Sequence, residues 1–186
     1  MTPQALRAFA FDHLYPLPSA DHADNPPDTD KVLATLQPEE RTLAFHVAAR
    51  RLAFQLLYQL DAAATPPDEK ALAAFVHHTL AHVPGLGPID MDQTTTLIIG
   101  AHNARKQADA EFLDLAPEWP TSRLAAVDRS ILRLAHFEMT SGRTPPKISV
   151  NEAVELAKHY STEKSPAFIN GLLDKVLKRV EATPGK

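Results

Sequence analysis

One side of the segment 46–59 carries the kinds of side chain that proteins use to bind RNA. Arginine supplies a fixed positive charge for phosphates, amide groups read base edges, and aromatic rings stack on unpaired bases. If the segment is a helix, this side lies opposite an apolar stripe and should face solvent. Its side chains are those of His46, Arg50, Arg51, Gln55, Tyr58 and Gln59. An ordinary solvated helix face would show the same pattern, so both interpretations stay open here.

Other chemistry finds little support in the sequence. His78 and His82 stand four residues apart, which places both imidazoles on one face of a helix. No glutamate lies between them in the register of zinc proteases, and no third ligand is near, so we predict no metal site. Phosphate-binding glycine loops, nucleophile elbows and dinucleotide fingerprints are also missing. The chain is therefore predicted not to be an enzyme and to need no cofactor.

Apolar residues recur at helical spacing from Pro38 onwards. The clearest stripe, in the segment that carries the arginines, consists of Ala49, Leu52, Ala53, Leu56, Leu57 and Leu60. Similar stripes follow within 72–80, 97–115, 124–135, 150–157 and 169–180, and prolines or glycines separate them. Because no stretch alternates with period two over a strand's length, the sequence predicts an all-α fold with six or seven helices.

The first 36 residues differ from the rest of the chain. Residues 3–15 have the apolar spacing of one short helix, and a proline-rich linker with many aspartates follows through residue 30. We therefore divide the chain into an acidic N-terminal extension, 1–36, and a helical domain, 37–182. A poorly ordered extension and a helix docked on the domain are both compatible with this pattern.

Composition limits the compartment and the class of partner. The 186 residues include no cysteine, and no apolar run is long enough to cross a membrane, so we expect a cytoplasmic protein without a membrane partner. The formal net charge of −4 argues against a globally basic nucleic-acid binder. Any RNA binding must therefore depend on local groups of positive charge.

Two helices meet at a corner within residues 147–178. Ser149 and Glu152 have the spacing of a capping box, which predicts a helix start, and Ser165 followed by Pro166 predicts a second start. The order Asn151-Glu152-Ala153, Ala157-Lys158, Phe168-Ile169-Asn170-Gly171 and Leu173-Asp174-Lys175 resembles the C-terminal signature of the NusB transcription antitermination family. ARRLAFQLLYQLD at 49–61 and RLAAVDRSILRLAHFEM at 123–139 resemble its first and central helices.

The resemblance implies a compact bundle of two helical halves and an antitermination factor that binds boxA-like RNA in nascent rRNA. Its partners would be NusE, a small-subunit ribosomal protein, and the RNA polymerase antitermination complex. Arg50, Gln55 and Tyr58 fall on family positions, but His46, Val47 and Ala48 stand where the family usually has a cluster of arginines. Losing cationic contacts to phosphate should weaken RNA binding. Arg51, and His46 when protonated, are candidates to compensate.

The resemblance also assigns residues at the corner and on the central helix. Lys164, Ser165 and Phe168 would contact RNA through charge, hydrogen bonding and stacking, whereas Tyr58 and Asp128 fall on positions that contact NusE. Phe168 serves equally well as a plug of the helix junction. Asp128 has the alternatives of an intrahelical ion pair or plain solvation.

Three further alternatives stay open. The fold is compatible with a protein-interaction module that has lost specific RNA binding, as the missing arginines would allow. A related helical domain occurs in rRNA methyltransferases, so an accessory subunit of such an enzyme is another alternative. A homodimer would bury the same arginine-bearing helix that RNA needs.

Overall fold

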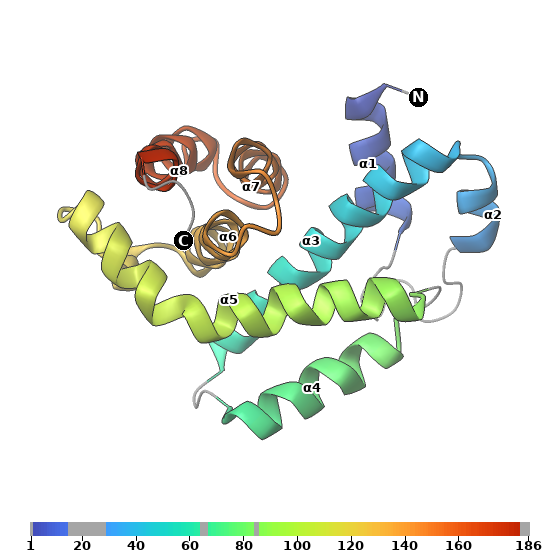
Figure 1. The fold of residues 1–186 in the computed structure, drawn as a ribbon, viewed down its shortest axis with the longest axis horizontal. Coiled ribbons are helices and arrows are strands. Elements are labelled where there is room, and N and C mark those ends of the chain that lie inside the picture. The colour runs from blue at the N-terminus through green and yellow to red at the C-terminus, as the bar shows by residue number, and fades with distance from the viewer. Residues whose placement is uncertain (1, 15–28, 64–66, 84–85, 183–186) are drawn as a thin grey trace. The chain divides into compact units, whose positions relative to one another are not determined.

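The structure is a computed structural model that describes residues 2–14, 29–63, 67–83 and 86–182 (Figure 1). Every regular element among these residues is a helix, which confirms the predicted all-α fold. The elements are α1 (Pro3–His13), α2 (Thr29–Ala34), α3 (Pro38–Ala62), α4 (Glu69–Ala81), α5 (Pro88–Leu115), a 3-10 turn (Thr121–Arg123), α6 (Ala126–Thr140), α7 (Pro146–Tyr160) and α8 (Ser165–Ala182). In this described part, α3 to α8 supply the predicted helices, and α1 and α2 lie in the segment 1–36.

The chain divides into two compact units. The first contains Met1–Leu56 and Pro67–Thr96, and the second contains Leu57–Pro66 and Leu97–Lys186. The long helices α3 and α5 each contribute residues to both units. The boundary between an extension and a domain at residue 36 remains a prediction.

Side-chain caps begin two helices of the first unit. Thr2 Oγ1 accepts a hydrogen bond of 3.2 Å from Ala5 N at the start of α1, and Asp68 Oδ1 accepts one of 2.8 Å from Ala71 N at the start of α4. Leu6 and Ala10 of α1 are buried, so the short helix predicted over 3–15 exists and is docked. The predicted proline-rich linker falls mostly on residues 15–28, which lie outside the described residues.

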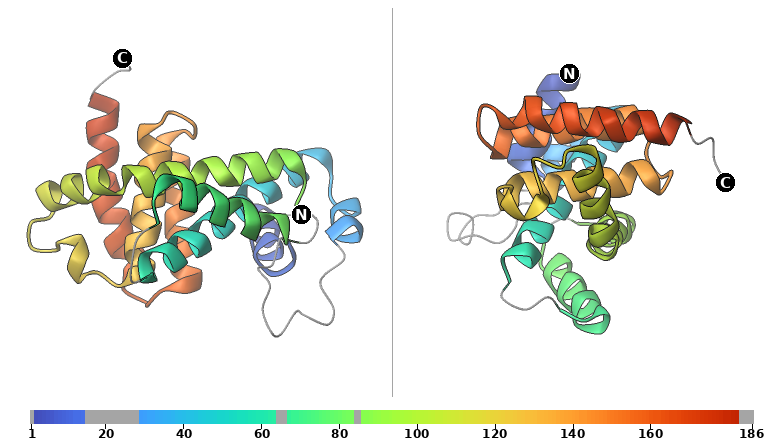
Figure 2. Two further views of the ribbon diagram at one scale, coloured as in Figure 1. Left: turned by 90° about the horizontal axis from the view of Figure 1, so that it is seen from below. Right: turned by 90° about the vertical axis from the view of Figure 1, so that its left-hand side faces the viewer.

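In the second unit, α6, α7 and α8 pack against one another, as Figures 1 and 2 show from three sides. Each helix turns one apolar stripe toward the other two, as its helical spacing predicts. The buried side chains of these stripes include Ile131, Leu134, Ala135, Val150, Ala153, Ala157, Ile169, Leu172, Leu173 and Val176. This packing fixes the corner between α7 and α8 relative to the start of α6.

The capping box predicted at Ser149 is wrong. Helix α7 begins three residues earlier, at Pro146, where the ring fixes φ at a helical value and the missing N–H is not needed. Ser149 lies inside the helix, fully buried, and its backbone N–H donates to the carbonyl of Pro145. The start of α8 at Ser165 agrees with the prediction.

Two helical glycines give a paired test of packing in the second unit. A Cβ on Gly100 of α5 would overlap the ring of Phe137 on α6, whereas a Cβ on Gly171 of α8 would meet no atom within 4 Å. We expect Gly100→Ala to lower the free energy of unfolding by about 1–2 kcal/mol, because the ring must move. Gly171→Ala should raise it by about 0.5–1 kcal/mol through higher helix propensity. Urea denaturation of both variants measures this, and equal effects would contradict the packing.

No helix in the described part of the chain is long and apolar enough to span a membrane.

Candidate nucleic-acid and protein interface

The central part of α3 is buried on every side. Eight consecutive residues, 47–54, are buried, among them Arg50 at 8% exposure and Arg51 at 4%. The prediction that both arginines face solvent is therefore wrong. The spacing of apolar residues identified the most apolar stripe of α3. It did not show that the opposite side of the helix, which carries the arginines, is covered as well.

The arginines make specific contacts in the first unit. Arg51 Nη2 donates to the backbone carbonyl of Leu14, directly after α1, and Arg50 Nη1 donates to the carbonyl of His46 at 3.3 Å. His46 is exposed and Gln55 is half-buried. Of the predicted face on α3, His46, Tyr58 and Gln59 are thus the exposed side chains, with Tyr58 at 41% exposure.

A hydroxyl–carboxylate network ties the start of α6 to the α7–α8 corner. Ser161 Oγ lies 2.6 Å from Asp128 Oδ1, and Ser165 Oγ donates to Asp128 Oδ2 at 2.9 Å. The hydroxyls of Thr162 and Ser165 are also 2.9 Å apart, which allows Thr162 to donate to Ser165. Asp128 therefore accepts hydrogen bonds from both serines, and this satisfies a carboxylate that is largely buried. Neither alternative drawn from the sequence, an intrahelical ion pair or solvation, describes it.

Beside this network lies a cavity of about 360 Å³, which we call the corner cavity. Its aromatic walls are Trp119 and Phe168, whose rings meet edge to face with centroids 5.9 Å apart. Its lining residues are Trp119, Arg123, Leu124, Ala125, Asp128, Lys164, Ser165 and Phe168. The cavity thus combines two exposed cations, two aromatic rings, and the Asp128 carboxylate with the Ser165 hydroxyl that donates to it. The rings and the cations suit a base with its phosphate.

The corner cavity brings together four residues that the sequence singled out: Asp128, Lys164, Ser165 and Phe168. Phe168 is half-buried and lines the cavity, and its two roles drawn from the sequence, a plug of the helix junction and a contact to RNA, both stay predictions. Sequence reasoning missed Trp119, which is 49% exposed, because it lies among the prolines that marked a break between helices. Trp119 is the only tryptophan of the chain, and this was the one signal in the sequence that could have identified it as a candidate site residue.

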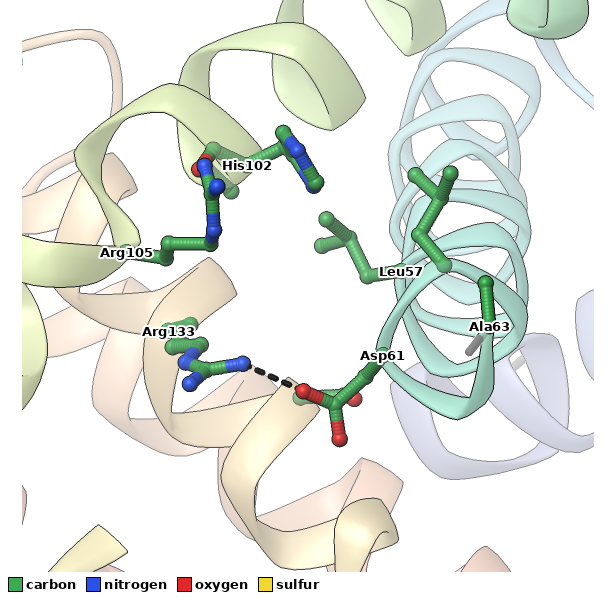
Figure 3. A pocket seen from close by; sticks show the side chains of 9 residues that line it. Leu57, Asp61, Ala63, His102, Arg105 and Arg133 are labelled. Carbon is green, nitrogen blue, oxygen red and sulfur yellow. Dashed lines mark hydrogen bonds and ion pairs between the residues drawn. The ribbon is translucent and has the colours of Figure 1, made fainter. Parts of the chain in front are cut away.

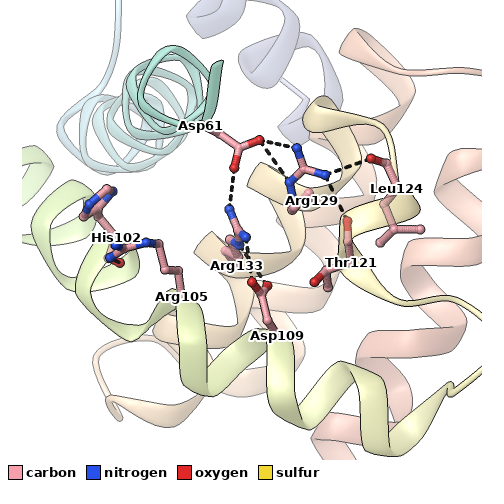
Figure 4. A network of polar contacts seen from close by, with 8 residues as sticks. All are labelled: Asp61, His102, Arg105, Asp109, Thr121, Leu124, Arg129 and Arg133. Atoms are coloured by element: carbon pink, nitrogen blue, oxygen red, sulfur yellow. Dashed lines mark hydrogen bonds and ion pairs between the residues drawn. The ribbon is translucent and has the colours of Figure 1, made fainter. Parts of the chain in front are cut away.

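A polar network in the second unit joins α3, α5 and α6 (Figure 4). Asp61 accepts hydrogen bonds from Arg129 Nε at 3.0 Å and from Arg133 Nη1 at 2.6 Å, and Arg133 also makes a two-pronged contact with Asp109. Burial acts to raise the pKa of Asp61, but hydrogen bonds and charge from both arginines outweigh it and hold that pKa below its ordinary value. Arg129 also donates to the carbonyl oxygens of Thr121 and Leu124, which positions the turn before α6.

His102 borders this network and should make stability depend on pH. Burial, followed by the charges of Arg105 and Arg133, lowers the pKa of His102 below 6.5, while Asp61 opposes this shift. As pH decreases, His102 is then protonated at a higher pH in the unfolded chain than in the folded one. The free energy of unfolding should therefore fall as pH decreases below about 6.5. His102→Gln should flatten this slope in urea denaturation between pH 7 and 5. His77→Gln, at an exposed position on α4, is the control, and an equal slope in wild type and His102→Gln would contradict the assignment.

His78 and His82 lie next to each other at the end of α4. Their rings lie 4.6 Å apart, and His82 Nδ1 is 2.7 Å from the carbonyl oxygen of His78. Within the described ranges, no group of three or more histidine or acidic side chains could hold a metal ion.

Comparison with known proteins places these features in a family. The model of the NusB family matches residues 47–178. A curated transcription antitermination protein NusB from Symbiobacterium thermophilum is 37% identical over 143 residues, which cover 74% of this chain and 92% of the relative.

Solved structures show the same fold. A structure of T. maritima NusB is 27% identical, with a TM-score of 0.59, and the match covers 70% of this chain and 88% of that one. A second structure, described as the antitermination factors NusB and NusE in complex with double-stranded RNA, is 23% identical with a TM-score of 0.59. It covers 73% of this chain and 97% of that chain, and at this identity it supports the fold alone.

Proposed function

This chain belongs to the NusB family, and from that premise we propose that it is a non-enzymatic transcription antitermination factor. It would bind boxA-like RNA together with NusE during rRNA transcription and enter the RNA polymerase antitermination complex. The observation that carries the proposal is the corner cavity, where aromatic, cationic and hydroxyl groups converge.

Phe168 and Trp119 would hold an unpaired base in this cavity. Base stacking on aromatic rings contributes about 1–3 kcal/mol per base. Lys164 and Arg123, both exposed, would neutralise the neighbouring phosphates, and Ser165 keeps the α8 start close to Asp128. The hydrogen-bond network of Asp128 with Ser161 and Ser165 would therefore contribute to RNA binding indirectly, by holding the wall of the cavity in place.

NusE would bind through Tyr58 and the region of Asp128. A half-exposed tyrosine is a favourable anchor, because its ring buries a large area while its hydroxyl keeps a polar partner. The Asp128 carboxylate already binds Ser161 and Ser165, so its charge would reach a basic partner over a distance rather than by direct contact.

The N-terminal segment is expected to limit RNA binding on α3. Deleting residues 1–36 removes the Leu14 carbonyl to which Arg51 Nη2 donates, so this N–H would be able to donate to a phosphate instead. RNA affinity should rise about two- to tenfold, the contribution of one hydrogen bond. Filter binding of labelled boxA-like RNA measures it, with circular dichroism to verify folding. Arg51→Gln in the shortened chain is the control and should abolish the gain, whereas unchanged affinity on deletion would refute this role.

A salt titration tests the proposed function. The affinity for single-stranded boxA-like RNA is measured at increasing salt, with and without NusE. Specific binding should depend on salt with a slope of roughly −0.7 per neutralised phosphate. No specific binding in either condition would refute the proposal.

One observation favours a second candidate, a protein-interaction module without specific RNA affinity. Arg50 and Arg51 are buried, and the positions before Arg50 lack the family's arginines. Such a module would bind NusE in the same titration without binding RNA.

A further inference from the structure

A second cavity, of about 110 Å³, lies in the second unit and shares no lining residue with the corner cavity. It is formed by the end of α3 together with α5 and α6 (Figure 3). Its polar lining consists of Asp61, His102, Arg105, Ser130 and Arg133, and leucine and alanine side chains complete it. The volume is several times the roughly 30 Å³ of one liquid water, but too small for a nucleoside.

The charges around this cavity leave a positive excess. Arg105, Arg129 and Arg133 carry three positive charges, while Asp61 and Asp109 carry two negative ones. Arg129 and Arg133 are bound to these carboxylates, so Arg105 is the cation whose charge no carboxylate of the network compensates. Figure 3 shows its guanidinium at the backbone carbonyl of His102, whose ring points the other way, toward α3.

Hydrogen-bond donors in the lining are incompletely used. Arg105 Nη1 donates to the carbonyl of His102 at 2.6 Å, and no other bond of its guanidinium occurs within the described residues. Ser130 is 1% exposed, yet its Oγ has no hydrogen-bond partner in the described part of the chain. A buried hydroxyl without a partner costs about 1–3 kcal/mol, so a molecule that accepts its hydrogen bond would recover that cost.

We propose that this cavity binds one tetrahedral oxyanion, either inorganic phosphate or the phosphate group of a nucleotide. Arg105 would contribute charge and N–H donors, and Ser130 would donate its hydroxyl to a second oxygen of the anion. The planar guanidinium suits the paired oxygens of phosphate. Because burial and Arg105 lower the pKa of His102, its ring is neutral at pH 7 and offers one N–H to the anion.

Isothermal titration calorimetry at constant ionic strength tests this site with inorganic phosphate, adenosine 5′-monophosphate and adenosine. Wild-type protein should bind phosphate at one saturable site. Arg105→Gln should weaken it at least about tenfold, the contribution of a hydrogen bond to a charged group. Ser130→Ala should weaken it a few-fold and guards against a folding defect in the first variant. Lys106→Gln, an exposed neighbour that removes the same charge, should bind as wild type does.

The outcomes separate the possible occupants. Tighter binding of the monophosphate than of inorganic phosphate would assign the anion to a nucleotide, and the reverse would assign it to the free ion. No saturable binding, equal affinity in wild type and Arg105→Gln, or adenosine binding as tightly as its monophosphate would overturn the proposal. The lining of the site shares no residue with the surfaces proposed for RNA and NusE, so its failure would leave the proposed function untouched.

Discussion

Replacing Asp61 by alanine is expected to lower the free energy of unfolding by about 3 kcal/mol, as loss of one partner from a buried ion pair does. Asp61 binds both Arg129 and Arg133, and the three side chains are only 14–18% exposed. Without the carboxylate, two guanidinium groups keep their partial burial and lose a shared counterion. Arg133 retains Asp109, and Arg129 retains two carbonyl oxygens, so the chain should still fold. Urea denaturation at pH 7 measures the loss.

The exposed pair of Lys158 and Glu155 supplies the control. Glu155→Gln should change stability by less than about 1 kcal/mol, because solvent screens the pair. Since the pKa of Asp61 is lowered in the folded chain, its contribution should be complete above the ordinary aspartate pKa and disappear as pH falls through the lowered value. An Asp61→Ala effect no larger than that of Glu155→Gln would contradict the network.

Phe168→Ala should weaken binding of boxA-like RNA about tenfold to a hundredfold, the contribution of one stacked base. The ring lines the corner cavity and meets Trp119 edge to face, so it can present a π surface to a base. Fluorescence anisotropy with labelled RNA in the presence of NusE measures the change.

Two substitutions separate stacking from a structural role of Phe168. Phe168→Leu keeps the apolar bulk that fills a helix junction, whereas Phe168→Tyr keeps the aromatic face. If the ring stacks on RNA, leucine should bind as poorly as alanine and tyrosine should restore affinity. Wild-type affinity with leucine would mean that the side chain only packs.

Local patterns predicted the helices of this protein well. The helical spacing of apolar residues and the prolines and glycines that interrupt it depend only on neighbouring residues. They located α3 to α8 and the short α1 without tertiary information. The same reasoning failed at Ser149, because a serine three residues before a glutamate looks identical inside a helix and at its start.

The site was predicted less completely, for physical reasons. Burial of Arg50 and Arg51 depends on what covers the opposite side of α3, which apolar spacing cannot show. Asp61 lies 68 and 72 residues from its arginine partners, so no local pattern announces the network. By contrast, the family resemblance singled out four residues that line one cavity. These residues lie at the α7–α8 corner and at the start of α6, where the local sequence itself signals the helices.

The most direct test of the central claim is the ratio of affinities for boxA-like RNA and for a shuffled RNA of equal length, measured at physiological salt with NusE present. Charge alone binds both RNAs equally, so the ratio isolates recognition of bases. We predict a ratio well above ten for the wild-type chain, reduced toward one by Phe168→Ala. A ratio of one for the wild type, with NusE bound, would contradict the account.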